Sequence, residues 1–173
     1  MTPVKSRFSV QVTPTTMENR FFKILFNEKG HMVSLLHKES GRETLKAPSN
    51  VLEIFEDPAR PTLSAWDIHP EYQNVMQTID DVTAVEVVEN NGERGILRIV
   101  RKFHKSTFTQ DIIAYADIPR IDFVTHVDYH EDMRLVKAAF YPAVQTSKAT
   151  YEIQFGAIER PTHRNTDYDE MRF

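Results

Sequence analysis

Short apolar runs alternate with turn-forming residues along most of the chain. Their spacing predicts strands over residues 20–26, 31–37, 51–56, 82–89, 95–103, 106–115, 120–129, 135–144 and 150–155. In the run 120–129, the odd positions from Ile121 to Tyr129 share one face and the even positions, from Asp122 to Asp128, share the other. A period of two residues fits a strand and not a helix. No stretch shows a convincing helical period for longer than one turn.

Two turn signals mark hairpins between these strands. Residues 27–30 separate the first two strands, and Gly30 stands where a positive φ is needed. Asn90-Asn91-Gly92 separates the strands 82–89 and 95–103. About nine short strands with regular turns predict an all-β, antiparallel sandwich. The longest irregular piece, residues 57–80, is of a length that in a compact domain indicates function or disorder.

Composition narrows the class of protein. The 173 residues, 40% hydrophobic and 27% charged, suit one globular domain over 1–173, with 1–16 as a leader strand. The absence of Cys excludes disulfide scaffolds, thiolate zinc sites and Cys nucleophiles. A net charge of −4 gives no general attraction for nucleic acid. Because no signal peptide or membrane span is recognisable, we expect a cytoplasmic protein that does not contact membranes.

A polar group on one predicted strand has the residue types of a zinc site. His126, Asp128 and His130 lie on one face of the strand 120–129, and imidazole and carboxylate are proper zinc ligands. Successive side chains on that face are about 6.6 Å apart, so all three cannot easily reach one ion. We favour a polar strand face that is wet or covered by another domain.

The irregular segment contains a candidate sugar site. Trp66 and Asp67 stand between prolines, and Tyr72 follows in the same segment. An exposed Trp ring can stack on the C–H face of a sugar while a carboxylate accepts hydrogen bonds from its hydroxyls. Trp66 could equally close one end of the sandwich, and the composition does not choose between these roles.

Other polar groups have weaker functional signals. Residues 159–166 (ERPTHRNT) could bind a carboxylate or hydroxyls through Arg, His and Asn, but we favour an ordered connector. The acid pairs Asp80-Asp81 and Glu131-Asp132 are adjacent in sequence, so their side chains diverge on a strand and do not form a glycosidase pair. A solvated sheet face accounts for the basic string Arg94, Arg98, Arg101, Lys102 and Lys105.

Four blocks resemble, in the same order, the β-sandwich region of glycoside hydrolase family 38 α-mannosidases of the bacterial branch. They are residues 17–45 (MENRFFKILFNEKGHMVSLLHKESGRETL), 63–70 (LSAWDIHP), 121–131 (IDFVTHVDYHE) and 149–166 (ATYEIQFGAIERPTHRNT). The resemblance covers nearly the whole chain from Met17 onward. Four separated blocks in register are more specific than any single motif.

The resemblance implies a galactose-mutarotase-like supersandwich that lies C-terminal to a catalytic barrel and a helical bundle. The family's chain continues beyond the position of Phe173, so we expect a domain truncated at its C-terminal end. In this family one zinc ion is held by upstream parts, which implies no cofactor, metal ligand or catalytic residue here. Trp66 and Asp67 correspond to a family segment that brings an aromatic side chain to the substrate. The implied partners are the upstream barrel and bundle of the same chain and mannose-containing glycans.

Three functions follow as hypotheses. The first is a non-catalytic segment of a zinc-dependent retaining α-mannosidase, which braces the barrel and lines one wall of the sugar site. The second is a self-contained carbohydrate-binding module built on Trp66, Asp67 and Tyr72. The third is an aldose-epimerase-like enzyme in which His126 or His163 serves as the acid. Exposed strand edges and apolar surface are also expected to favour a homo-oligomer.

Overall fold

The computed structural model describes residues 9–58, 68 and 71–163, and this part of the chain is built from short antiparallel strands. The first seven are β1 Gln11–Val12, β2 Thr16–Glu18, β3 Phe22–Phe26, β4 Met32–His37, β5 Arg42–Glu43, β6 Val51–Glu56 and β7 Met76–Thr78. The other seven are β8 Asp81–Asn90, β9 Arg94–Phe103, β10 Ser106–Tyr115, β11 Ile121–Asp128, β12 Arg134–Ala139, β13 Lys148–Ile153 and β14 Gly156–Pro161. A single 3₁₀ turn, η1, spans Tyr72–Asn74. The described residues contain no helix that is long and apolar enough to cross a membrane.

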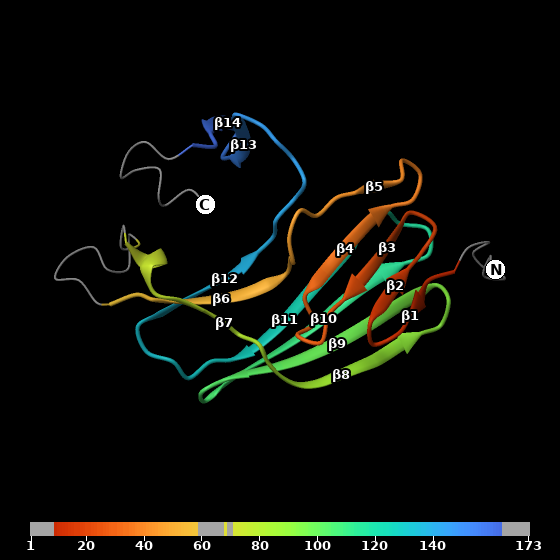
Figure 1. Ribbon diagram of the computed structural model, residues 1–173, viewed down its shortest axis with the longest axis horizontal. Helices are drawn as coiled ribbons and strands as arrows, with labels where there is room; N and C mark the ends of the chain where they lie inside the picture. The colour runs from red at the N-terminus through yellow and green to blue at the C-terminus, as the bar shows by residue number, and fades with distance from the viewer. Residues whose placement is uncertain (1–8, 59–67, 69–70, 164–173) are drawn as a thin grey trace.

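The strands form two main layers and two smaller sheets. A five-stranded sheet has the order β1-β2-β3-β4-β5, and it lies over a four-stranded sheet with the order β11-β10-β9-β8 (Figure 1). A three-stranded sheet, β12-β6-β7, extends from one end of these layers, and the β13-β14 hairpin stands apart from them (Figure 1). All the pairings are antiparallel, which confirms the predicted all-β fold class.

The main core lies between the two large sheets. In β3 the burial alternates strictly, with Ile24 fully buried and Lys23 exposed, as expected for a strand that faces a core on one side. Ile24 and Met17 from the five-stranded sheet join one cluster with Ile99 and Ile112 from the four-stranded sheet. Removal of this apolar surface from water is the main force that holds the two layers together.

A second core fixes the three-stranded sheet. Leu52 and Ile54 of β6 cluster with Ile79 and with Phe103 and Phe108 of the four-stranded sheet. The pairing of β12 and β6 runs through six consecutive residue pairs, from Arg134 with Glu56 to Ala139 with Val51. The chain therefore crosses from one sheet to another between β11 and β12, and both of these are edge strands.

Both predicted hairpins are confirmed. Gly30, between β3 and β4, has φ 72°, and Gly92, between β8 and β9, has φ 88°. The predicted strands 51–56 and 106–115 agree residue for residue with β6 and β10. The sequence interpretation missed β1, β2, β5, β7 and β14. Four of these have only two or three residues, too few for a visible period.

Three sequence interpretations need correction. Arg101 is fully buried, so the basic string does not lie on one solvated face. The predicted irregular segment 57–80 contains η1 and β7, and β7 pairs with β6. Residues 159–161 belong to β14 and are not a connector. In each case the decisive contact comes from a segment distant in sequence, which a local pattern does not reveal.

Candidate functional site: a buried polar joint and an adjoining groove

The predicted sugar-site residues Trp66 and Asp67 lie outside the described residues. Tyr72, from the same segment, is 3% exposed. Its ring packs edge-on against Phe55 with 5.1 Å between centroids, and its hydroxyl accepts a 2.7 Å hydrogen bond from Lys137 Nζ. The expectation that Tyr72 takes part in an exposed sugar platform is therefore wrong, because its ring is used in packing.

The His126, Asp128 and His130 group lies at the exposed end of β11. His130 Nε2 is 2.8 Å from Asp128 Oδ1, and both side chains are more than half exposed. The His130 backbone N–H donates to Ser106 Oγ at 2.8 Å, which anchors the residue after the strand ends. Among the residues that the structure describes, no three His, Asp or Glu side chains converge closely enough to hold a metal ion. The described part of the chain therefore does not supply a zinc ligand set.

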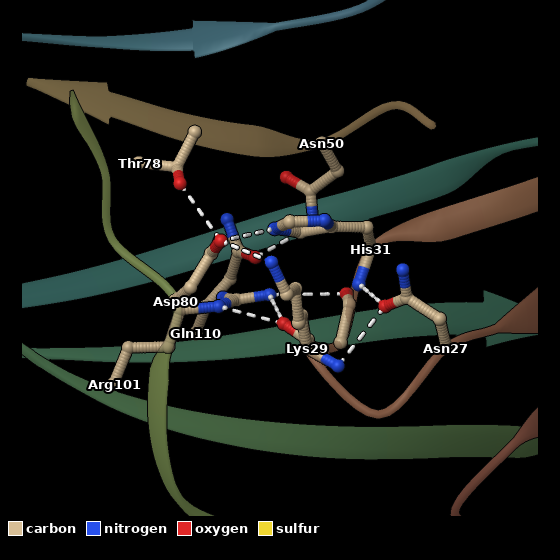
Figure 2. Close-up of polar contacts among 9 residues, drawn as sticks. Asn27, Lys29, His31, Asn50, Thr78, Asp80, Arg101 and Gln110 are labelled. Atoms are coloured by element: carbon tan, nitrogen blue, oxygen red, sulfur yellow. Dashed lines mark hydrogen bonds and ion pairs between the residues drawn. The ribbon is translucent and has the colours of Figure 1, made fainter. Parts of the chain in front are cut away.

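A polar cluster that the sequence analysis did not anticipate lies between the sheets, with Asp80 at its centre (Figure 2). Asp80 Oδ2 accepts hydrogen bonds from Lys29 Nζ and Thr78 Oγ1, both at 2.7 Å. Asp80 Oδ1 is 3.1 Å from His31 Nε2, and the His31 side chain is 7% exposed. Residues from the β3–β4 turn and from the β7–β8 connection thus meet on one carboxylate. We call this group, together with Arg101, the polar joint.

The surroundings shift the ionisation of both partners. Burial by itself would raise the pKa of Asp80, but hydrogen bonds from Lys29 and Thr78 and the nearby charges lower it overall. Burial lowers the pKa of His31 and outweighs the opposing attraction of Asp80. The structure therefore favours a charged Asp80 beside a neutral His31.

Arg101 closes the polar joint from β9. Its Nη2 donates to the carbonyl oxygens of Lys29 and Gly30, at 3.1 and 3.0 Å, and its Nε also reaches Lys29 O at 3.2 Å. Burial lowers the pKa of Arg101 to about 10, with Asp80 opposing the shift. The turn that receives these bonds is also braced by Asn27 Oδ1, which accepts from the Lys29 and His31 backbone N–H groups.

The chemistry of the polar joint is structural. A paired His and Asp can act as acid and base in an active site, but here His31 is only 5% exposed. The hydrogen bonds of Arg101 end on backbone carbonyls of the facing sheet. One sequence signal could have identified the polar joint. Arg101 is in the same alternating row as Leu97, Ile99 and Phe103, whose side chains face the core. A lone cation in a buried row needs acceptors from another element.

An open groove of about 350 Å³ adjoins this region between β11 and β12. At its base, Asn50 Nδ2 donates to Gln110 Oε1 at 2.7 Å, and Gln110 Nε2 donates to Thr125 Oγ1 at 3.1 Å. Its aromatic wall is the pair Phe123 and Phe140, packed edge-on with centroids 5.4 Å apart. Asn50 is fully buried, and its Oδ1 makes no hydrogen bond among the described residues. A groove of this kind can accept an apolar or hydroxyl-bearing group.

Comparison with protein families gives one match over most of the chain. Residues 17–173 match the model of the glycosyl hydrolases family 38 C-terminal domain. Alpha-mannosidase G of Dictyostelium discoideum is 32% identical over 91% of this chain, and human alpha-mannosidase 2C1 is 30% identical over 99% of it. The chain spans only 15% and 17% of the lengths of these two relatives.

A solved structure supports the fold. The crystal structure of an alpha-mannosidase from Enterococcus faecalis V583 superposes with a TM-score of 0.73 and covers 96% of this chain. The aligned region is 22% of that protein, at 13% sequence identity. At this identity the likeness concerns the arrangement of the strands.

Proposed function

Because the chain belongs to glycosyl hydrolase family 38 and corresponds to its C-terminal domain, we propose that it is a non-catalytic β-sandwich segment of an α-mannosidase. The parent enzyme would be zinc-dependent and retaining, and it would cleave α-linked mannose from glycans in the cytoplasm. The observation that carries the proposal is the family match over residues 17–173, supported by relatives that are several times longer than this chain.

The role proposed for this segment is to brace the catalytic parts of the same polypeptide. The described residues do not fit a zinc ion, since no three suitable side chains converge and the sequence has no Cys. The family resemblance is the ground on which we place the zinc of the parent enzyme in parts that precede this chain. The residues that do converge, in the polar joint, tie the two sheets to each other, as a scaffold requires.

We also propose that Trp66 and Asp67 line one wall of the mannose site. Both ends of the segment that contains them are anchored to the sandwich. The Glu56 N–H donates to Val75 O at 3.4 Å, and the buried Tyr72 packs on Phe55. Fixing both ends of a segment lowers the conformational entropy that its side chains lose when a ligand binds.

The test of the non-catalytic role is an activity assay on the purified 173-residue chain. With an aryl α-mannoside and added zinc, we expect no turnover above the buffer rate. Zinc-dependent turnover by pure chain would contradict the proposal. Unfolding by denaturant, measured on the same sample, confirms that the protein assayed is folded.

A carbohydrate-binding module remains the second candidate, because the groove between β11 and β12 combines aromatic walls with a polar base. Calorimetric titration with mannose and short mannans separates the two roles. A wall segment should show no binding at millimolar sugar, whereas a module should bind and lose binding on Phe123→Ala or Trp66→Ala. The epimerase hypothesis has less support, since His126 is on the opposite face of β11 from the groove residue Thr125. A polarimetric assay on α-glucose is expected to show no rate above water.

A further inference from the structure

The two edges of the four-stranded sheet differ in how well they are protected from pairing with another strand. The edge strand β8 has two register shifts against β9, one between Val82 and Ala84 and one between Val87 and Glu89. Such bulges twist an edge and disrupt its row of backbone groups. The opposite edge strand, β11, pairs with β10 through eight consecutive residue pairs without any shift.

The composition of β11 also leaves its edge open. Its sequence, IDFVTHVD, contains no Pro, Lys or Gly, and half of its eight residues are β-branched. Val124 and Val127 are 42% and 48% exposed. Within the described part of the chain, no strand pairs with β11 on the side away from β10. A regular, partly apolar edge with free N–H and C=O groups is a template for a further strand.

We propose that the free edge of β11 pairs antiparallel with β11 of a second copy of this chain, about a two-fold axis at Val124. About this axis, a residue that precedes Val124 by a given number of positions lies opposite the residue that follows Val124 by the same number in the other copy. The two residue numbers therefore sum to 248, and both side chains lie on the same face of the joined sheet. This inference is independent of the proposed function.

Charge complementarity selects this register. On the outer face, Arg120 of one copy stands opposite Asp128 of the other, and Asp122 stands opposite His126, with Val124 facing its own symmetry mate. Because of the symmetry, each of these contacts occurs twice, and the Arg120–Asp128 contact joins opposite charges. A partner can reach both side chains, since that of Arg120 is 60% exposed and that of Asp128 is 74% exposed. Arg120 would then bridge Asp122 of its own chain and Asp128 of the other copy, and Asp128 would keep its contact with His130.

Neighbouring registers are worse on the same criterion. A two-fold axis at Thr125 would set Asp122 directly opposite Asp128, which places like charges in contact. An axis at Phe123 would set Arg120 opposite His126 and leave Asp122 opposite Val124. Cross-strand charge therefore favours a two-fold axis at Val124 over either neighbouring register.

The inner face of the joined sheet is compatible with the same pairing. There Ile121 of one copy faces Val127 of the other, and Phe123 faces Thr125. Three of these residues, Phe123, Thr125 and Val127, line the groove in each copy. Pairing would therefore cover the exposed Val127 and join the two grooves into a continuous channel beneath an eight-stranded sheet.

The first test is disulfide trapping, which the natural absence of Cys makes direct. In the 173-residue chain with Val124→Cys, the two sulfurs would meet at the axis, within the Cα separation that a disulfide needs. We expect rapid formation of a covalent dimer under mild oxidation. Val87→Cys, at 38% exposure on the opposite edge, is the matched control and should stay monomeric. Equal rates for the two variants, or faster crosslinking of His126→Cys, would overturn the proposal.

The second test is a charge exchange followed by sedimentation equilibrium. Asp128→Arg places an arginine opposite Arg120 of the other copy, and the two-fold symmetry repeats this like-charge contact. We expect the dimer dissociation constant to rise roughly tenfold. Adding Arg120→Asp to that variant restores opposite charges and should return the constant to within about threefold of the parent value. A parent chain that sediments as a monomer at 100-fold excess over the trapping concentration, or a double variant as weak as the single one, would refute the pairing. Far-UV circular dichroism checks that each variant is folded.

Discussion

The buried guanidinium of Arg101 donates a 3.0 Å hydrogen bond from Nη2 to the carbonyl oxygen of Gly30, 71 residues earlier in the chain. The bond joins the inner face of β9 to the β3–β4 turn of the facing sheet (Figure 2). It has little competition from water, because Arg101 is fully buried. A hydrogen bond from a buried charge is strong, and leaving such a charge unpaired is costly.

Replacing Arg101 should destabilise the chain far more than replacing a partly exposed arginine of the same strand. Arg101→Ala removes the donor to the buried Gly30 carbonyl and to the part-buried Lys29 carbonyl and leaves a cavity. We expect a loss of about 3 kcal/mol in the free energy of unfolding. Arg98→Ala is the control, because the Arg98–Asp111 pair is partly exposed and should contribute less than about 1 kcal/mol. Urea unfolding followed by fluorescence measures both. Equal losses would show that the buried bonds add nothing special.

Gly30→Ala should also be strongly destabilising. An added Cβ would lie 2.7 Å from Arg101 Nη2 and 2.8 Å from Ile99 Cδ1, at a residue with φ 72°. Backbone strain and overpacking together predict a loss of roughly 2–4 kcal/mol. Gly41→Ala provides the matched control, since its φ is 65° but no atom lies within 4 Å of the added Cβ. In the control, backbone strain alone should lower the free energy of unfolding, by about 1–2 kcal/mol. A similar loss in both variants would argue against the contact with Arg101.

The His31–Asp80 pair predicts that the free energy of unfolding decreases as the pH is lowered. The pKa of His31 is lowered in the folded state, so the unfolded chain binds the proton more readily. The contribution of neutral His31 is complete above the unfolded value near 6.5 and is lost as pH falls towards the folded pKa. The pKa of Asp80 is also lowered, so its contribution disappears as pH falls further, below the unfolded carboxyl value.

Unfolding curves at pH 8, 7, 6 and 5 measure this dependence. His31→Gln removes the titrating imidazole, and it should flatten the curve below pH 6.5 while lowering stability at pH 8. His163→Gln, at an exposed position, should leave the slope unchanged. If the pH dependence persists in His31→Gln, the titrating group lies elsewhere.

Asn50 combines a left-handed backbone, with φ 58°, and a fully buried side chain that bonds Gln110. Asn50→Gly removes the hydrogen bond, but glycine adopts the left-handed backbone conformation without strain. Asn50→Ala removes the same hydrogen bond and also introduces backbone strain. We expect both to destabilise the chain, with Asn50→Ala worse by about 1 kcal/mol. Thermal unfolding would detect the difference, and equal melting temperatures would mean that backbone strain plays no part.

Local pattern was a good guide to long strands with a clear alternation and to the turns that a glycine marks. The alternation within β10 and the glycines at positions 30 and 92 were read correctly because each signal lies within a few residues. The short strand β7 was missed because its pairing with β6 supplies the only sign that it is a strand. The burial of Tyr72 was missed for the same reason, since Phe55 and Lys137 come from other parts of the chain.

One candidate site was predicted from the sequence, and the other was found only in the tertiary structure. Trp66 and Asp67 stay a prediction from the family resemblance. The polar joint became visible only in three dimensions, although Lys29 lies in a predicted turn, Asp80 in an acid pair and Arg101 in the basic string. Asp80 and Lys29 are 51 residues apart, and no local period connects them.

The amino-acid order alone determined that this chain forms antiparallel strands, where its main turns fall, and to which family it belongs. The strands and turns depend on backbone preferences and on side-chain alternation, both of which act between near neighbours. The family follows from the resemblance of four sequence blocks and from the family match over residues 17–173. The tertiary structure decided which polar groups are buried together and which edge of the four-stranded sheet is regular and has no partner strand among the described residues. Those outcomes depend on the packing of one sheet against another, where desolvation and long-range hydrogen bonds give Arg101 and Asp80 surroundings that their sequence neighbours do not reveal.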